Sequence, residues 1–531
     1  MSTGSHEAAP ATTASTPSPT RRGPAARSVA IWLITCLAAF AALAGWSIAS
    51  PAGSSPDDDY HLASIWCAQG LDPDRCVALE GQPDHRVLPY LATGAGICYG
   101  GDFTASAACQ EQFTLKGPQT AIDHGNWGGA YPPYFYGLMS LFVGDDVGPS
   151  VAVMRLVNSL VAIALVAGLA ALLPRRRRPL AAVPLVLTSV PLTMALLAST
   201  NPSSWAILGA ATVWPALYVA YEEQGWRRNA LAAFAVLASF IGSGSRADGC
   251  LFVLMSIALV VILRARHLRR VPVVTGAALV AFALAAAIFL SSGHSSALTD
   301  GFGYTRSELT TLQLLLINLS SLPTLWLGMF GSGPLGNIGW FDTPVPPMVP
   351  MLGIAAWFGV LLQGWRRMFP AKLVGLVLVG AALFVHPLYL LLQSHVLVGE
   401  GVQPRYVLPI LIIFTGLSLL GTRGTTLRLS PVAYWGIVAA LGLAHAVSLH
   451  IQIRRYVTGL DVSKIVFGDD LEWWWDSAPD ATLVWLAASA GFTWVVAAVL
   501  RQALVAPDRP RGSAHAGSGA GRSWARRPRS A

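Results

Sequence analysis

"RRGPAARSVAIWLITCLAAFAALAGWSIAS" occupies residues 21–50 and decides the class of fold. Arginines open the stretch, and an apolar run follows from residue 28 to residue 50. A run of about 20 apolar residues can cross the hydrocarbon core of a bilayer as a helix. The apolar core of a cleavable signal peptide is shorter, at roughly 7–15 residues. The stretch therefore predicts a retained first membrane span.

Comparable apolar runs recur along the whole chain of 531 residues, of which 54% are hydrophobic and 12% charged. Soluble domains carry about twice that charged fraction. We therefore expect an all-α polytopic membrane domain over residues 28–505, with about 12 transmembrane helices. The expected spans are residues 28–50, 151–173, 179–198, 203–221, 229–245, 249–263, 271–290, 347–363, 371–391, 407–421, 431–449 and 482–500.

The formal net charge of +8 comes from arginines in short loops and tails. This distribution is typical of orientation by the positive-inside rule and does not indicate nucleic acid as a partner. With an even number of spans, all clusters share one side with both termini, which is then cytoplasmic. Residues 1–27 and the basic residues 506–531 are expected to be disordered tails on that side. The clusters are Arg21 and Arg22, residues 175–178, Arg227 and Arg228, residues 264–270, Arg366 and Arg367, Arg423 and Arg428, and the C-terminal tail.

Residues 309–330, "LTTLQLLLINLSSLPTLWLGMF", are long enough to span, but a span here would move Arg366 and Arg367 to the opposite side. We therefore expect a re-entrant or interfacial helix on the outer face.

The acidic residues gather in the loops expected outside. Residues 51–150 form a large extracytoplasmic loop with twelve acidic residues against three basic ones, and residues 291–346 and 451–481 form further outer loops. No expected span has a carboxylate at its centre. The ionisable chemistry is therefore predicted on the outer face.

Four of the six cysteines, Cys67, Cys76, Cys98 and Cys109, lie in the first outer loop. Four cysteines in an extracytoplasmic loop indicate disulfides, which three connectivities could form. The short separations favour Cys67–Cys76 and Cys98–Cys109. A zinc site is the alternative, although the loop has no C-x-x-C pair.

"SSPDDDYH", residues 54–61, places three acids beside a histidine directly after the first span. Asp57 or Asp58 is a candidate general base, with His61 on the same helical face. The same two carboxylates are a candidate site for a divalent cation, Mg²⁺ or Mn²⁺, beside a phosphate. The structural alternative is an acidic N-cap that stabilises the first turn of a helix.

Other outer segments supply candidate binding residues. Arg405 and Tyr406 lie in "GVQPRYVLP", where an arginine can hold a phosphate with two parallel hydrogen bonds or extend to lipid headgroups. Asp342 in "GNIGWFDTPVPP" is a second candidate for substrate binding or a turn former. Tyr131 opens "YPPYFYG", a short aromatic segment that fits an interfacial anchor or a wall for a lipid or sugar.

The order of "SPDDDYHLASIWC", "YPPYFY", "MRLVN", "NPSSWAI", "GWFDTPVP" and "GVQPRYVLP" resembles a family of predicted bacterial membrane proteins, actinobacterial members above all, that is known only as a domain of unknown function. The arrangement is also similar to the GT-C fold of integral-membrane glycosyltransferases. The resemblance covers residues 28–500. The family pattern has Asp-Glu where this chain has Asp57 and Asp58, and a histidine that matches His61.

The resemblance implies a multi-pass protein of the bacterial plasma membrane that moves a sugar from a polyprenyl-phosphate donor to a glycan or protein acceptor. Catalysis would lie at the acidic pair and phosphate binding at Arg405. Two alternatives stay open on the sequence. One is a transporter or flippase for lipid or polysaccharide, and the other is a non-catalytic scaffold of the cell envelope.

Overall fold

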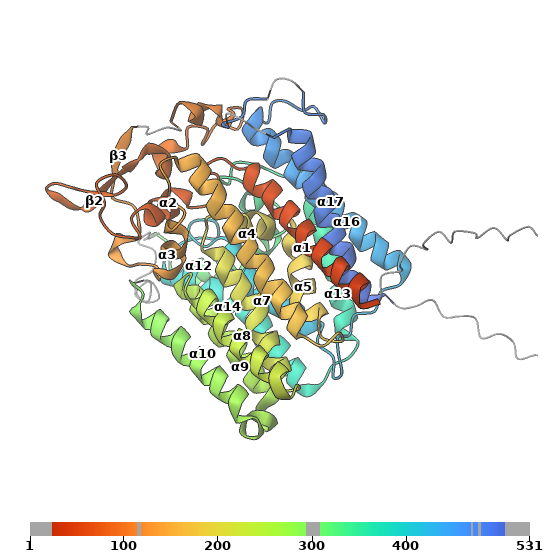
Figure 1. Cartoon of the computed structure of the whole chain (residues 1–531). Helices are drawn as coiled ribbons and strands as arrows, with labels where there is room; N and C mark the ends of the chain where they lie inside the picture. Colours follow the sequence, from red (N-terminus) through yellow and green to blue (C-terminus); the bar gives the residue numbers. More distant parts are fainter. Residues whose placement is uncertain (1–23, 114–117, 294–307, 469–470, 476–478, 505–531) are drawn as a thin grey trace, which may run out of the picture.

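The structure is a computed structural model that describes residues 24–113, 118–293, 308–468, 471–475 and 479–504. It is a bundle of long helices capped at one end by residues 49–113 and 118–146 (Figure 1). The polytopic, almost entirely helical class is therefore confirmed. The tails expected over 1–27 and 506–531 lie outside the described residues, apart from residues 24–27, which begin the first helix.

Ten helices in the described part of the chain are long and apolar enough to cross a membrane. The bent pair α5–α6 would make an eleventh span. The ten are α1 (Pro24–Ile48), α4 (Val147–Leu172), α7 (Ser203–Ala220), α9 (Ala247–Arg264), α10 (Pro272–Ser291), α12 (Thr311–Gly328), α13 (Met348–Trp365), α14 (Pro370–Gln393), α16 (Pro431–Val457) and α17 (Ala481–Leu500).

Two of the twelve expected spans fall short of this length or apolarity. The expected span 229–245 is α8 (Gly225–Ser243), which opens with Arg227 and Arg228 and packs along α7 and α10. The expected span 407–421 is α15 (Leu408–Ser418), an 11-residue helix that is buried almost throughout. Conversely, the segment 309–330, expected to be re-entrant or interfacial, contains α12. This continuous helix of 18 residues is long and apolar enough to cross a membrane.

The expected span 179–198 is broken. Helix α5 (Pro179–Leu187) and the following helical segment, Ser189–Leu197, meet at a bend of 104°. Val190 has non-helical dihedral angles there. It precedes Pro191, and the ring of a proline disfavours the helical region for the residue before it. The short α6 (Met194–Leu197) then leads into the loop 198–202, which contacts the candidate site.

Residues 49–113 and 118–146 form the cap, and we call this end of the bundle the loop end. The cap contains α2 (Asp58–Trp66), α3 (Tyr134–Ser140) and a small antiparallel sheet that the sequence did not predict. The strands are β1 (Val77–Leu79), β2 (Gln82–Pro89) and β3 (Gln119–Ile122), in the order β1-β2-β3. The disulfides Cys67–Cys76 and Cys98–Cys109 are both present, which confirms the expected pairing.

Helix α1 links the two ends of the bundle. It packs against α17 along its length and against α4, and it leads directly into the turn that carries the three acids (Figure 1). At the opposite end, which we call the arginine end, α1 begins near the last turn of α17. The expected outer loops are shorter than predicted, because α12 takes up part of 291–346 and α16 extends to Val457.

Candidate functional site

Asp57 and Asp58 are adjacent in the chain, but their side chains face different partners. Asp57 occupies the N-cap position of α2 with left-handed dihedral angles (φ 57°, ψ 23°). Among residues with a side chain, aspartate is one of the few that adopts this region readily. The Asp57 carboxylate makes no capping hydrogen bond to the helix. A capping hydrogen bond to α2 therefore does not explain the presence of the Asp57 carboxylate at this position.

Asp58 is fully buried beneath the turn. Its Oδ2 accepts hydrogen bonds from Arg155 Nη2 at 3.1 Å and from the Ser55 amide at 3.1 Å, and its Oδ1 accepts one from Thr200 Oγ1 at 2.8 Å. Burial raises the pKa of Asp58, and the charge of Arg155 and these hydrogen bonds oppose the rise. Three donors around one carboxylate fit its ionised form.

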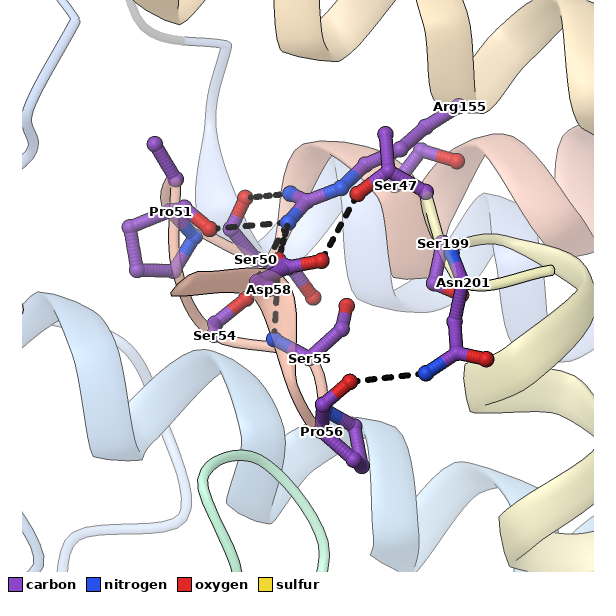
Figure 2. A network of polar contacts seen from close by, with 12 residues as sticks. Ser47, Ser50, Pro51, Ser54, Ser55, Pro56, Asp58, Arg155, Ser199 and Asn201 are labelled. Atoms are coloured by element: carbon purple, nitrogen blue, oxygen red, sulfur yellow. Dashed lines mark hydrogen bonds and ion pairs between the residues drawn. The ribbon is translucent and has the colours of Figure 1, made fainter. Parts of the chain in front are cut away.

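Arg155 of α4, also buried, fastens the turn as a whole (Figure 2). It donates to the carbonyl oxygens of Ser50 and Pro51 as well as to Asp58. From the 198–202 loop, Asn201 donates to the carbonyl oxygen of Pro56 at 2.7 Å. The polar groups of the turn are thus satisfied internally, which fixes the backbone on which Asp57 sits.

Asp57 forms an ion pair with Arg405, which lies 348 residues further along the chain in the short helix Pro404–Tyr406. The Asp57 side chain is 37% exposed, whereas that of Arg405 is 1% exposed. Burial raises the pKa of Asp57, but the charges of Arg405 and other neighbours outweigh it and hold the pKa below its usual value. Asp57 is therefore ionised and reachable from solvent.

Arg405 keeps unused hydrogen-bonding capacity. Its Nη2 contacts Asp57 and the Tyr406 hydroxyl, but Nε and Nη1 are buried and have no partner among the described residues. An unpaired buried donor is costly in a folded protein. A guanidinium with two free N–H edges is a typical receptor for a phosphate or carboxylate.

Aromatic rings and a second arginine complete the cluster. The guanidinium carbon of Arg246 lies 4.7 Å from the centroid of the Tyr406 ring and 5.4 Å from that of Tyr131. Its Nε donates to Asp248 at 2.9 Å. The Arg405 guanidinium lies 5.0 Å from the Tyr406 ring, so two cations share one ring. Cation–π contacts of this kind hold charged groups in a desolvated place.

His61 lies beneath these rings and is fully buried. Its Nδ1 is 2.9 Å from the Tyr136 hydroxyl, and its Nε2 has no partner in the described part of the chain. The Tyr131 ring packs edge-on at 5.6 Å. Burial lowers the pKa of His61 to about 3, so the imidazole is neutral at physiological pH.

The lowered pKa of His61 predicts that the folded protein loses stability in acid. The substitution His61→Gln should remove part of this loss. Between the unfolded pKa near 6.5 and the folded value near 3, the unfolded chain binds a proton that the folded chain does not. Stability therefore falls as pH falls through this window, by up to about 1.4 kcal/mol per pH unit from this residue. Thermal unfolding of detergent-purified protein between pH 7.5 and pH 5 should show a shallower decline for His61→Gln than for the wild type. Equal slopes for the two proteins would contradict the burial of a neutral His61.

The carboxylates do not form the expected cation site. No group of three or more His, Cys, Asp or Glu side chains within the described ranges is arranged to hold a metal ion. Asp57 faces Arg405 and Asp58 faces Arg155. Each carboxylate is already neutralised by a guanidinium, so the pair does not offer the free negative charge that Mg²⁺ or Mn²⁺ would need.

The remaining predicted site residues divide into two groups. Tyr131 and Tyr406 join Asp57, His61 and Arg405 in the cluster, as described above. Asp342 belongs to a neighbouring network, because its Oδ2 accepts from Arg455 Nη2 at 2.6 Å. That arginine also binds the carbonyl oxygens of Tyr99 and Ala105, so Asp342 helps to hold the cap on the bundle.

Sequence reasoning did not identify the partners of the buried acid. Arg155 lies in "MRLVN", and Thr200 directly precedes "NPSSWAI", two segments that carry the resemblance only by their order. Nothing local marks them as contacts of Asp58, since they are 97 and 142 residues away from it. A buried arginine near the end of an apolar helix was the one available signal.

The model of a family described as Predicted membrane protein (DUF2142) matches residues 40–414. The matched region is more than two thirds of the chain and includes every residue of the cluster from Asp57 to Tyr406. Arg455 lies beyond it. No protein with a curated description matches the chain at a significant level.

Proposed function

We propose that this chain, which belongs to the DUF2142 family of predicted membrane proteins, is a glycosyltransferase that moves a sugar from a polyprenyl-phosphate donor to a glycan or protein acceptor. The reaction would take place at the loop end of the bundle. The observation that carries the proposal is the pairing of an ionised, partly exposed Asp57 with a buried Arg405 whose Nε and Nη1 have no partner among the described residues.

The two residues have the properties that such a transfer needs. An acceptor hydroxyl gives its proton to the Asp57 carboxylate as its oxygen bonds to the anomeric carbon of the sugar. The bond between that carbon and the donor phosphate breaks, and its electron pair leaves with the phosphate. Arg405 stabilises the departing phosphate through the N–H groups that Asp57 does not use. Attack opposite to the leaving group inverts the anomeric configuration.

The neighbouring side chains would form the sugar pocket. The Tyr131 and Tyr406 rings offer stacking surfaces, and the neutral His61 offers Nε2 to a sugar hydroxyl. Arg246 adds a second positive charge beside the phosphate position without contacting Asp57 through a hydrogen bond.

We place the loop end outside the bacterial plasma membrane and both termini in the cytoplasm. The disulfides support this placement, because they persist in oxidising compartments. The arginine clusters at the other end support it through the positive-inside rule. A lipid-linked donor in the outer leaflet would then lie on the same side of the membrane as Arg405.

The proposal is tested by deleting the gene in its host and profiling envelope polysaccharides and glycoproteins by mass spectrometry. We expect one sugar to disappear from an envelope glycan and to return when the wild-type gene is restored, but not with an empty vector. If no glycan changes, the glycosyltransferase proposal is wrong, and a scaffold or transport function would explain the chain better.

A further inference from the structure

A basic pocket lies at the arginine end, opposite the candidate site. Its volume is about 450 Å³. Of the residues that the structure describes, five arginines and no acidic residue line it: Arg175, Arg176, Arg367, Arg423 and Arg428. None of the five takes part in an ion pair within the described part of the chain. Like charges gathered without counter-charges repel one another, so an anion would stabilise the pocket.

The pocket is built on a rigid frame. Arg177 is fully buried between the arginine turn and the 421–428 loop. It donates to Glu222 at 2.6 Å and to the carbonyl oxygens of Gly421 and Gly424 at 2.7 and 2.6 Å. The loop is also joined to the end of α17, where the Leu429 amide donates to the carbonyl oxygen of Ala503. The arginine turn and the 421–428 loop, which carry four of the five arginines, are thus held around one space.

An apolar groove of about 300 Å³ runs from this pocket along the membrane-facing helices. It lies between α1, α4, α5 and α17, and side chains such as Trp32, Val166 and Val499 line it. Arg178 and Gln502 are at its mouth. Pro179 and Gln502 line both the groove and the basic pocket, so the two spaces are continuous.

We infer that this composite site binds an anionic phospholipid, with the phosphate headgroup among the arginines and an acyl chain in the groove. Basic pockets between helices at the cytoplasmic surface are recognised sites for acidic lipid headgroups. Neither terminal tail fits as an occupant, because residues 505–531 are rich in arginine and residues 1–23 contain a single acid, Glu7. The site is separate from the proposed transfer site, since the α1 span between them is about 30 Å long.

The test uses full-length protein in detergent, incubated with dioleoylphosphatidylglycerol or dioleoylphosphatidylcholine. Bound lipid is counted by native mass spectrometry. We expect the anionic lipid to bind at least tenfold more tightly than the zwitterionic one. Arg423→Gln with Arg428→Gln should remove that preference. The matched control, Arg269→Gln with Arg270→Gln, removes the same charge from another exposed cluster and should keep it.

The groove has its own matched pair of variants on α4. Ala167→Phe fills the groove and should weaken lipid binding severalfold, whereas Ala164→Phe, which faces away from it, should not. Soluble glycerol 3-phosphate should compete poorly with the lipid, because it lacks an acyl chain. If both arginine double variants lose the preference for anionic lipid equally, general surface charge explains the binding and the inference is wrong. Equal binding of glycerol 3-phosphate and lipid, unaffected by Ala167→Phe, would overturn its lipid part. Neither readout depends on sugar transfer.

Discussion

Asp57→Asn is expected to slow sugar transfer by about 10²–10⁴-fold while the protein accumulates normally. The amide has the size of the carboxylate, and its oxygen can still accept a hydrogen bond from Arg405. It cannot accept a proton from the acceptor hydroxyl. Because the pKa of Asp57 is held below its usual value, the wild-type carboxylate is fully ionised at neutral pH, and the substitution removes all of the base.

The measurement returns each variant to the deletion strain and follows the rate at which the missing glycan reappears, at matched membrane levels. Asp59→Asn is the matched control, because Asp59 is the next acid but one in the same segment and lies 3.8 Å from the exposed His124 rather than at Arg405. Asp59→Asn should restore the glycan at close to the wild-type rate. If Asp57→Asn also does so, the proton acceptor lies elsewhere and the assigned mechanism is wrong.

Arg155→Met is expected to lower the thermal stability of the protein sharply or to prevent its accumulation. Arg155 is the only charged partner of the buried Asp58 among the described residues. Removing one partner of a buried ion pair costs about 3–5 kcal/mol, because the other charge remains without compensation. The Ser50 and Pro51 carbonyl oxygens also lose their donor, which adds to the loss of stability.

The double variant Arg155→Met with Asp58→Asn separates charge from packing. It leaves no unpaired charge, so it should recover much of the stability that the single variant loses. Thermal unfolding in detergent, with size-exclusion chromatography as the readout, compares the stability of the single and the double variant. Arg366→Met, which removes an exposed arginine, should behave like the wild type. A single variant as stable as the wild type would show that Arg155 does not hold the turn.

Periodicity and length were sufficient to predict the membrane class and most helices, because an apolar run of span length has few other stable conformations. They were insufficient where the chain departs from a straight helix. The break near Val190 depends on local dihedral angles, and α15 has only 11 residues and is buried almost throughout. The sheet in the cap has strands of three to eight residues with irregular burial, a weak signal in any single sequence.

The candidate site was predictable only in part. "PDDDYH" and "QPRY" contain side chains whose chemistry stands out in an apolar chain, and the structure brings Asp57, His61, Arg405 and Tyr406 together. The sequence did not predict that Asp57 would face Arg405 while Asp58 would be buried against Arg155. This arrangement follows from one left-handed residue and from a buried arginine on another helix, neither of which an acidic run reveals.

The spacing of the two ion pairs along the chain sets an order of assembly during synthesis. Arg155 follows Asp58 by 97 residues, whereas Arg405 follows Asp57 by 348. At roughly 5–20 residues per second, the first pair can close many seconds before the second arginine leaves the ribosome. The ion pair of Asp58 with Arg155 can therefore form before Arg405 is available to pair with Asp57. Any nascent or truncated chain that ends before residue 405 can hold the acid in place but lacks the guanidinium that pairs with it.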